Sequence, residues 1–419
     1  MKTKLFAISL LSFAALTHTN YQIAAAAPDP RNPIQSRILG GHTGSVYSVA
    51  FSPDGSKLAT GSNDGTALIL DARSRKLLHT LNGHTNPITS VAFSPDGSMI
   101  AGSDGRKARI WNTSSGSLVR TLRGHTGSVY SVAFSPDGSM LATGSDDCTA
   151  HVWNTSSGSL VRTLLGHTGR INSVVFSPDG SKLATSSFDG TARIWDAHSG
   201  ALLHILNGIT IYIYSVAFSP DGSMIAHSDD HTVRILDTHS GTLVHTLSCN
   251  TPNIYSIAFS PDGSKLAIGS WEHTARICDT HSGTLVHTLI GHTARVTSVA
   301  FSPDGSKLAT GSDDNTARIW YDTRTENKMR GAALALACAL HNRLGENSPA
   351  HVGLDPYLVR EIAMLARPDS FGPIDQEEHH VQAGEQPERQ GLTRYLPAVT
   401  IAVPGIAAAA WLLHHFMHR

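Results

Sequence analysis

The sequence predicts an all-β fold, a seven-bladed β-propeller with a short helical and partly disordered C-terminal extension. The first observation behind this prediction is the hexapeptide FSPDGS, which occurs seven times at intervals of 41 or 42 residues. A fixed period of this length is typical of one supersecondary unit that is copied and stacked. A catalytic motif is needed only once, so seven copies indicate architecture. The copies begin at Phe51, Phe93, Phe134, Phe176, Phe218, Phe259 and Phe301.

The second observation is that each copy contains the pattern of four short strands. In the third copy, SVYSVAFS alternates small or polar with apolar residues, which is the period of a β-strand. PDGS is a turn sequence, because proline presets φ, aspartate bonds its own backbone and glycine accepts a positive φ. MLATGS, TAHVW and LVRTL supply the second, third and fourth strands. One such sheet cannot bury both faces alone, but seven sheets arranged around an axis can.

The third observation concerns how the ring closes. After Trp320 the sequence YDTRTENKMRGAAL contains no fourth strand of the LVHTL kind, whereas IQSRIL at 34–39 has that pattern and precedes the first repeat. An unpaired sheet edge invites pairing with other chains, so it has to be covered. We therefore expect residues 34–39 to complete the seventh blade of a propeller that spans residues 34–322.

The repeats resemble the WD-repeat family. They share a Gly-His dipeptide, a hairpin and a Trp-Asp or Trp-Asn pair near the end of the third strand, and the resemblance covers residues 34–322. It implies a hydrogen-bonded tetrad of His, Ser or Thr, Asp and Trp in each complete copy, with a structural role. The three complete sets are His125, Thr143, Asp147 and Trp153; His167, Thr185, Asp189 and Trp195; and His292, Thr310, Asp314 and Trp320.

Four copies depart from this pattern. The first has Leu70 in place of the tryptophan, and the second is one residue short before its turn, at AGSDGRKA. The fifth has Ile209 and Leu236 in place of histidine and tryptophan, and the sixth has Asn250, Glu272 and Cys278. A buried polar group that loses its partner costs about 1–3 kcal/mol. We therefore expect blades five and six to be the softest sector of the ring.

The resemblance also implies a binding face on the side of the Gly-His loops. Three positions in each repeat project there: the fourth and sixth residues after the glycine, and the residue before the tetrad aspartate. Tyrosine, tryptophan and arginine dominate binding energy at protein interfaces, so we expect these positions to bind a partner. The candidate binding residues are Tyr47, Tyr130, Arg170, Phe188, Tyr212, Tyr214, Tyr255, Trp271 and Arg295.

Composition narrows the classes of function. The net charge of −1 gives no basic surface for a nucleic acid, and the four cysteines contain no CxxC pair, which disfavours a disulfide framework or a zinc site. No GxSxG, HExxH, GxxxxGK[ST] or strand-to-helix GxGxxG motif occurs. We therefore expect a monomeric, non-enzymatic scaffold without cofactor or metal that binds a protein or peptide. The alternatives are an adaptor whose C-terminal helices, faintly similar to F-box docking helices, recruit a second complex, and an enzyme.

The two ends of the chain differ from the repeats. Residues 1–27 combine Lys2 and Lys4, an apolar run and an alanine tract, which predicts a signal peptide; a disordered or membrane-associated leader is the alternative. At the other end we expect a helical extension at 323–370, a disordered linker at 371–395 and an apolar tail at 396–419. Its uncharged stretch, 396–413, has the minimum length for a membrane anchor, with an amphipathic or buried helix, or a tail without a role, as alternatives.

These end segments predict a protein of the secretory pathway or a membrane-associated protein, with a cytoplasmic location as the alternative. Two sequons, at Asn112 and Asn154, fall in turns between the third and fourth strands of their copies. They become glycosylation sites if the leader directs the chain into the secretory pathway.

Overall fold

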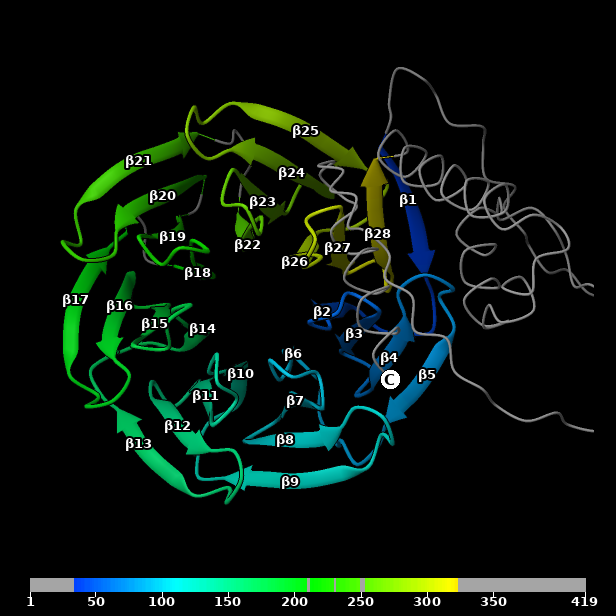
Figure 1. The fold of residues 1–419 in the computed structure, drawn as a ribbon, viewed down its shortest axis with the longest axis horizontal. Coiled ribbons are helices and arrows are strands. Elements are labelled where there is room, and N and C mark those ends of the chain that lie inside the picture. Colours follow the sequence, from blue (N-terminus) through cyan, green and yellow to red (C-terminus); the bar gives the residue numbers. More distant parts are fainter. Residues whose placement is uncertain (1–33, 209–211, 230, 249–252, 323–419) are drawn as a thin grey trace, which may run out of the picture.

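The computed structural model describes residues 34–208, 212–229, 231–248 and 253–322. In these ranges 28 strands form seven four-stranded antiparallel sheets arranged in a ring (Figure 1), which confirms the predicted seven-bladed propeller. These ranges contain no helix, and so none that could cross a membrane. The predicted leader, helical extension, linker and apolar tail (1–27, 323–370, 371–395 and 396–419) lie outside the described residues, as do Ile209 and Asn250.

Each blade runs from an innermost strand beside the axis to an outermost strand at the rim. The innermost strands are β2 (Val46–Phe51), β6 (Val91–Phe93), β10 (Val129–Phe134), β14 (Ile171–Phe176), β18 (Val216–Phe218), β22 (Ile254–Phe259) and β26 (Val296–Phe301). The second strands are β3 (Lys57–Ser62), β7 (Met99–Asp104), β11 (Met140–Ser145), β15 (Lys182–Ser187), β19 (Met224–Asp229), β23 (Lys265–Ser270) and β27 (Lys307–Ser312).

The outer half of each blade follows in the same order. The third strands are β4 (Ala67–Asp71), β8 (Lys107–Asn112), β12 (Ala150–Asn154), β16 (Thr191–Asp196), β20 (Thr232–Asp237), β24 (Thr274–Asp279) and β28 (Ala317–Asp322). The outermost strands of blades one to six are β5 (Leu77–Leu81), β9 (Leu118–Arg123), β13 (Leu160–Leu164), β17 (Leu202–Asn207), β21 (Leu243–Ser248) and β25 (Leu285–Ile290). In blade seven this place is taken by β1 (Ile34–Leu39).

The FSPDGS motif forms the turn between the innermost and second strands. In the first copy the amide and hydroxyl of Ser56 donate to the two carboxylate oxygens of Asp54, at 3.0 and 2.7 Å. Gly55 has a φ of 68°, a conformation that glycine adopts without strain. The same serine-to-aspartate bonds recur in the other six copies. The repeated hexapeptide therefore forms the same turn in every blade.

The hydrophobic core is divided into clusters that each lie between two neighbouring blades. One such cluster joins Ala142 and Val152 of blade three to Ile171 and Val174 of blade four. The blades approach closely here: a Cβ added to Gly144 would lie 2.6 Å from Cγ2 of Ile171. Because the clusters join neighbours, each sheet buries both faces only while the blades on its two sides are in place.

Neighbouring innermost strands are also joined by a hydrogen bond between a backbone amide and a serine hydroxyl. The amide of Val174 in blade four donates to Oγ of Ser131 in blade three at 3.0 Å. Equivalent bonds join five further pairs of blades, with Ser48, Ser90, Ser215, Ser256 and Ser298 as acceptors. Between blades four and five the described residues contain no such bond from Val216 to Ser173. There Nδ2 of Asn172 donates to the carbonyl of Ile213 at 3.0 Å instead.

The phenylalanines of the seven FSPDGS copies all line one cavity of about 630 Å³. Each of them ends an innermost strand, and every blade contributes one, so the cavity lies on the axis of the ring. Alanine and valine side chains of the same strands complete its apolar wall. The motif thus forms the lining of the axial channel as well as a turn.

The ring closes between the two ends of the propeller. β1 pairs antiparallel with β28 along its whole length, from Ile34 opposite Asp322 to Leu39 opposite Ala317 (Figure 1, dark blue and yellow). Two side-chain contacts reinforce this pair. Nε of Arg37 donates to the hydroxyl of Tyr321 at 3.1 Å, and Nη1 of Arg318 donates to Oγ of Ser36 at 3.2 Å. The strand expected to complete the seventh blade therefore lies in that place.

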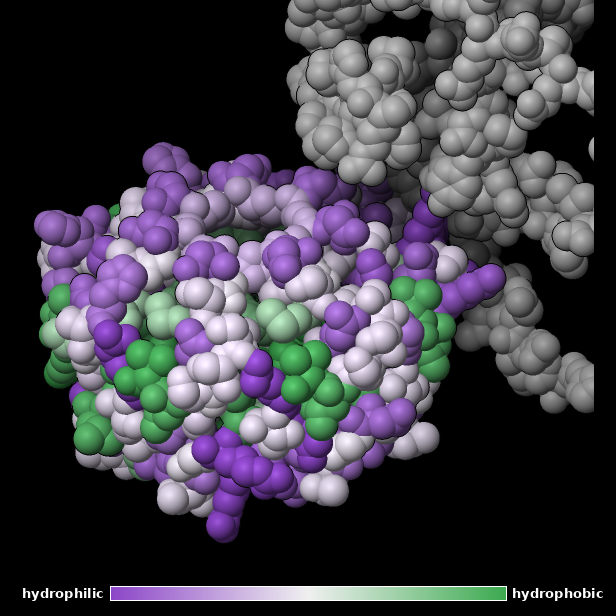
Figure 2. Space-filling view, turned by 60° about the horizontal axis from the view of Figure 1, so that its bottom comes forward, coloured by the Kyte–Doolittle hydropathy of each residue, from purple (hydrophilic) through white to green (hydrophobic). Residues whose placement is uncertain are grey.

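The rim of the ring carries exposed apolar side chains. They come in adjacent pairs near the start of the outermost strands, such as Leu77 with Leu78 and Leu118 with Val119. Figure 2 shows hydrophobic patches on the outer side of the ring, set between polar surfaces. These four side chains belong to none of the apolar clusters between blades, which on the same strands include Leu81 and Leu122.

The serine bonds between blades make a prediction about stability. Ser131→Ala removes the acceptor of the Val174 amide, so we expect the free energy of unfolding to fall by about 1–3 kcal/mol. Ser173→Ala is the matched control, because Ser173 holds the equivalent position but accepts no such bond. Urea unfolding followed by circular dichroism measures both variants. Equal losses of stability in the two would show that the bond is not what stabilises the junction.

Candidate functional site

The three tetrads that the sequence predicts are hydrogen-bonded chains of side chains. In blade three, Nε1 of Trp153 donates to Oγ1 of Thr143 at 2.9 Å, and that oxygen lies 2.8 Å from Nε2 of His125. Nδ1 of the same histidine lies 2.8 Å from Oδ2 of Asp147. Blades four and seven repeat this arrangement with His167, Thr185, Asp189 and Trp195, and with His292, Thr310, Asp314 and Trp320.

The hydrogen bonds of these chains run in the order hydroxyl, imidazole, carboxylate, but the hydroxyls at their inner ends are buried. An indole N–H only donates, so the threonine oxygen accepts it and has its own proton for Nε2 of the histidine. The histidine then carries its proton on Nδ1 and donates it to the aspartate. Thr143, Thr185 and Thr310 have no exposed surface, so a substrate cannot reach their hydroxyls. These are structural contacts that tie the Gly-His loop to the second and third strands.

Burial and hydrogen bonding set the charge states in a tetrad. Burial lowers the pKa of His167, and Asp189 opposes that shift only in part. Burial alone would raise the pKa of Asp189, but hydrogen bonds from Thr191 and His167 hold it at about 2. At neutral pH the pair is therefore a neutral imidazole beside a carboxylate.

The first two blades keep part of the tetrad. In blade one, Nδ1 and Nε2 of His42 lie 3.0 Å from Asp64 and 2.7 Å from Thr60, although Leu70 replaces the tryptophan. Blade two, which is one residue short, lacks the chain. There Asp104 pairs with Nε of Arg109 at 2.7 Å, and both ring nitrogens of His84 are buried without a hydrogen-bond partner in the described residues.

Blades five and six have lost the tetrad. In blade five His227 stands where the complete copies have threonine, and its Nε2 is buried without a hydrogen-bond partner in the part of the chain described here. In blade six Cys278 fills the tryptophan position and is buried, while Glu272 pairs with Arg276 at 2.7 Å.

The candidate binding residues come together on the face of the Gly-His loops. The guanidinium of Arg170 lies over the ring of Tyr130 in blade three and over the ring of Phe188 in its own blade, with its carbon 4.1 and 4.0 Å from the two ring centroids. Phe188 in turn contacts Tyr212 and Tyr214 of blade five, at centroid distances of 4.7 and 5.1 Å. The contacts thus run continuously across three blades.

The chain of contacts continues through blades six and seven. Tyr214 meets Tyr255 at a centroid distance of 4.9 Å. The guanidinium carbon of Arg295 lies 5.2 Å from the ring of Tyr255 and 5.7 Å from the ring of Trp271. Eight of the nine candidates therefore form one continuous group, which we name the arginine–aromatic arc: Tyr130, Arg170, Phe188, Tyr212, Tyr214, Tyr255, Trp271 and Arg295.

Tyr47, the ninth candidate, makes none of these ring contacts in the described structure. Burial and the charge of Asp313 raise the pKa of its phenol. Two residues of this face were not among the candidates: Asp313, which pairs with Arg295, and Asn172, which accepts a hydrogen bond from Nε of Arg170 at 2.8 Å. Asn172 is the sixth residue after the glycine of its Gly-His pair, and Asp313 directly precedes the tetrad aspartate. Both positions are among the three that were expected to project on this face, so the sequence could have identified them.

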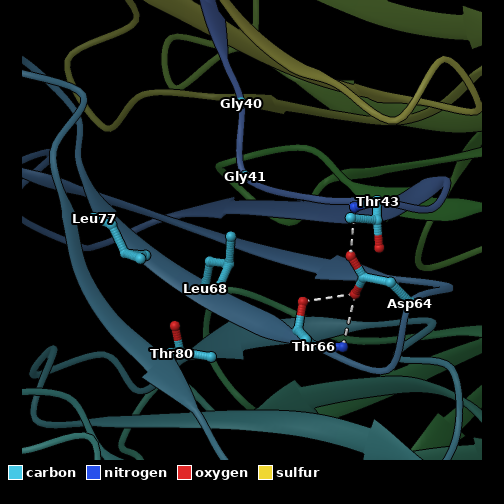
Figure 3. Close-up of a pocket in the computed structure, with 8 residues that line it drawn as sticks. All are labelled: Gly40, Gly41, Thr43, Asp64, Thr66, Leu68, Leu77 and Thr80. Carbon is cyan, nitrogen blue, oxygen red and sulfur yellow. Dashed lines mark hydrogen bonds between the residues drawn. The ribbon is translucent and has the colours of Figure 1, made fainter.

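A small surface pocket of about 300 Å³ lies beside the first Gly-His loop (Figure 3). Its apolar wall is formed by Leu68 and Leu77, and its polar wall includes Asp64. The Asp64 carboxylate already accepts the amides of Thr43 and Thr66. In blades four and seven, arginine stands at the position of Leu68, and its guanidinium lies against the glycine of the Gly-His pair. The pocket is therefore the space that the missing arginine leaves.

The repeats of this chain match a known protein family. The family described as WD domain, G-beta repeat matches seven times, over residues 33–71, 75–112, 116–154, 158–196, 200–237, 241–279 and 283–321. These matches cover more than half of the chain. The chain belongs to the WD40 family. A comparison with curated proteins found no match.

The WD40 repeat in the sequence is offset from the blade in space. Each matched segment begins with an outermost strand and ends with a third strand, so one repeat contributes to two neighbouring blades. WD40 propellers generally serve as scaffolds for protein interaction. In the ranges described here, no group of three or more His, Cys, Asp or Glu side chains is arranged to hold a metal ion.

His227 makes a prediction about pH. Burial lowers its pKa from 6.5 to about 4, whereas the unfolded chain takes up the proton near pH 6.5. Stability therefore falls as the pH drops from 6.5 to about 4, by on the order of 3 kcal/mol from this residue alone. His227→Thr, which restores the residue of the complete copies, should remove this part of the loss. Urea unfolding between pH 7 and pH 4 measures the difference, and parallel curves for the two proteins would contradict the assignment.

Proposed function

We propose that this WD40 protein is a non-enzymatic scaffold that binds a protein or peptide partner on the Gly-His face through the arginine–aromatic arc. The observation that supports the proposal is the continuity of the arc, since eight residues from blades three to seven contact one another in sequence. Residues scattered on a surface without a common role have no reason to form such a group.

The side chains of the arc suit a binding surface. Tyr212 and Trp271 have exposed fractions of 45% and 50%, so large parts of both rings face solvent. Aromatic side chains supply a large contact area and lose little rotamer entropy on binding. The contacts within the arc already restrict these rings before a partner arrives, which lowers the entropic cost of binding further.

Half of the arc lies in the two blades that have lost the tetrad. Blades five and six carry Tyr212, Tyr214, Tyr255 and Trp271. An alternative explanation for their divergence is drift after recent duplication of near-identical repeats. Duplication accounts for Tyr130, Tyr214 and Tyr255, which share one repeat position. However, Phe188, Tyr212 and Trp271 each occur in a single copy and still contact the arc, which favours selection for binding.

The adaptor alternative, in which C-terminal helices recruit a second complex, depends on residues 323–370 and stays a prediction. A propeller enzyme usually breaks the repeat symmetry with an acid or base at one place. Here the asymmetric positions of the arc are aromatic side chains and two arginines, which supports binding over catalysis.

The double variant Tyr214→Ala with Trp271→Ala tests the proposal. Peptides are selected from a random 12-residue library displayed on phage against the full-length chain, and their dissociation constants are then measured by fluorescence anisotropy. We expect the double variant to weaken binding by at least about 2 kcal/mol, because central aromatic residues contribute most of the energy at interfaces. The melting temperature should hardly change, since both residues lie on the surface.

Tyr47→Ala is the matched control, because Tyr47 occupies the same repeat position as Tyr214 but lies outside the arc. It should leave binding within about twofold of the wild type. Binding that survives the double variant and is lost in Tyr47→Ala would place the site at blade one, outside the arc.

We also propose that the chain enters the secretory pathway, on the pattern of residues 1–27. Asn112 and Asn154 are the last residues of β8 and β12, at the ends opposite the Gly-His loops. In both, the side-chain oxygen accepts hydrogen bonds from the following serines, and glycans on Nδ2 there would leave the arc uncovered. The expected result is a mature protein without residues 1–27. N-terminal sequencing that finds Met1 intact would contradict it.

A further inference from the structure

Arg170 is held in the arc by one hydrogen bond and two aromatic rings. Its Nε donates to Oδ1 of Asn172 at 2.8 Å, and Nδ2 of Asn172 donates to the carbonyl of Ile213 in the next blade. The guanidinium also lies over the rings of Tyr130 and Phe188. A cation over an aromatic face is attracted by about 0.5–2 kcal/mol, depending on how far it is desolvated. The Arg170 side chain is thus held by two aromatic rings and by the hydrogen bond that its Nε donates.

This guanidinium has no anionic partner within the described ranges. Arg295, the other arginine of the arc, pairs through Nε with the carboxylate of Asp313. Arg170 forms no ion pair with any described carboxylate, and its only hydrogen bond there uses Nε. Its two outer nitrogens therefore remain available, and together they form the planar fork that binds a carboxylate or phosphate in a bidentate manner.

We propose that Arg170 is the receptor for an anionic side chain of the bound peptide, either a carboxylate or a phosphorylated residue. This inference rests on the proposed binding function of the arc and names the chemistry of its partner. The anion lies against the outer nitrogens of Arg170. An apolar or aromatic side chain next to it in the peptide packs on the exposed ring of Tyr212 and the half-buried ring of Tyr214, which both contact Phe188 under the same guanidinium.

A cationic peptide fits the same surface poorly. Four of the six rings of the arc already carry Arg170 or Arg295, and the other two, Tyr212 and Tyr214, lie next to Phe188 under Arg170. A positive side chain would have to displace one of them or lie beside an unpaired like charge. Like charges brought together at an interface oppose binding, so the arc selects against basic partners.

The experiment uses the full-length chain and the displayed random 12-residue library. We expect the selected peptides to be rich in Asp and Glu next to an apolar residue. For one such peptide, anisotropy titrations compare the Glu form with its Gln and phosphoserine forms on three proteins: wild type, Arg170→Gln and Arg106→Gln. Arg106 is the matched control, because it is exposed in the turn between the second and third strands of blade two and lies outside the arc.

The inference expects Glu→Gln in the peptide to weaken binding at least about tenfold on wild type and on Arg106→Gln, the effect of losing a charge-assisted hydrogen bond. On Arg170→Gln the same change should matter less than about twofold. Tighter binding of the phosphoserine form would assign the site to a phosphorylated partner. Equal or weaker binding of that form would assign it to an acidic one.

Two results would overturn the inference. One is a set of selected peptides without acidic residues, and the other is an equal effect of Glu→Gln on wild type and Arg170→Gln. In both cases binding that is still lost in the Tyr214→Ala, Trp271→Ala variant leaves the proposed function standing. Peptides that are insensitive to that double variant would contradict the proposed function as well.

Discussion

The ring depends on how neighbouring innermost strands meet. Each of these strands is the edge of its own sheet, and an edge strand exposes backbone groups that need partners. The serine hydroxyl of one blade accepts the amide of the next, as Ser131 does for Val174, at six junctions among the described residues. The apolar clusters between blades form beside this contact, and at the junction of blades four and five a cluster forms without it. The axial cavity follows from the same geometry.

The arc extends over blades that keep the tetrad and blades that have lost it. Blades three, four and seven are each held by a complete tetrad, which ties the Gly-His loop to the strands behind it. Blades five and six lack it and carry most of the aromatic residues of the arc. The junction between blades four and five also lacks the serine bond, and Asn172 there serves both the junction and Arg170. The surface that we propose for binding therefore includes the sector in which regular contacts of the repeat are missing.

Much of this architecture follows from the sequence, for identifiable reasons. The period and the turn residues of FSPDGS predict the blades, and the missing fourth strand after Trp320 predicts the place of residues 34–39. The spacing of His125, Thr143, Asp147 and Trp153 predicts their tetrad. The contact of Arg170 with Tyr130 does not follow from any local pattern, because it joins different blades and depends on the angle between them. Nor does alternation along a strand reveal that Phe51 and its equivalents line the axis, since alternation identifies a face but not what that face meets.

The pairing of β1 with β28 sets the order of events when the protein is made. The residues that pair here, Ile34 and Asp322, stand at opposite ends of the propeller sequence. During translation β1 is synthesised long before β28. It therefore stays unpaired while the first six blades form. Closing so long a loop is slow, because its entropic cost precedes any gain from the contact. Until then β28 has no cover, and β1 of another nascent chain offers the same strand. The interval between the synthesis of β28 and its pairing with β1 is therefore when two chains can exchange closing strands.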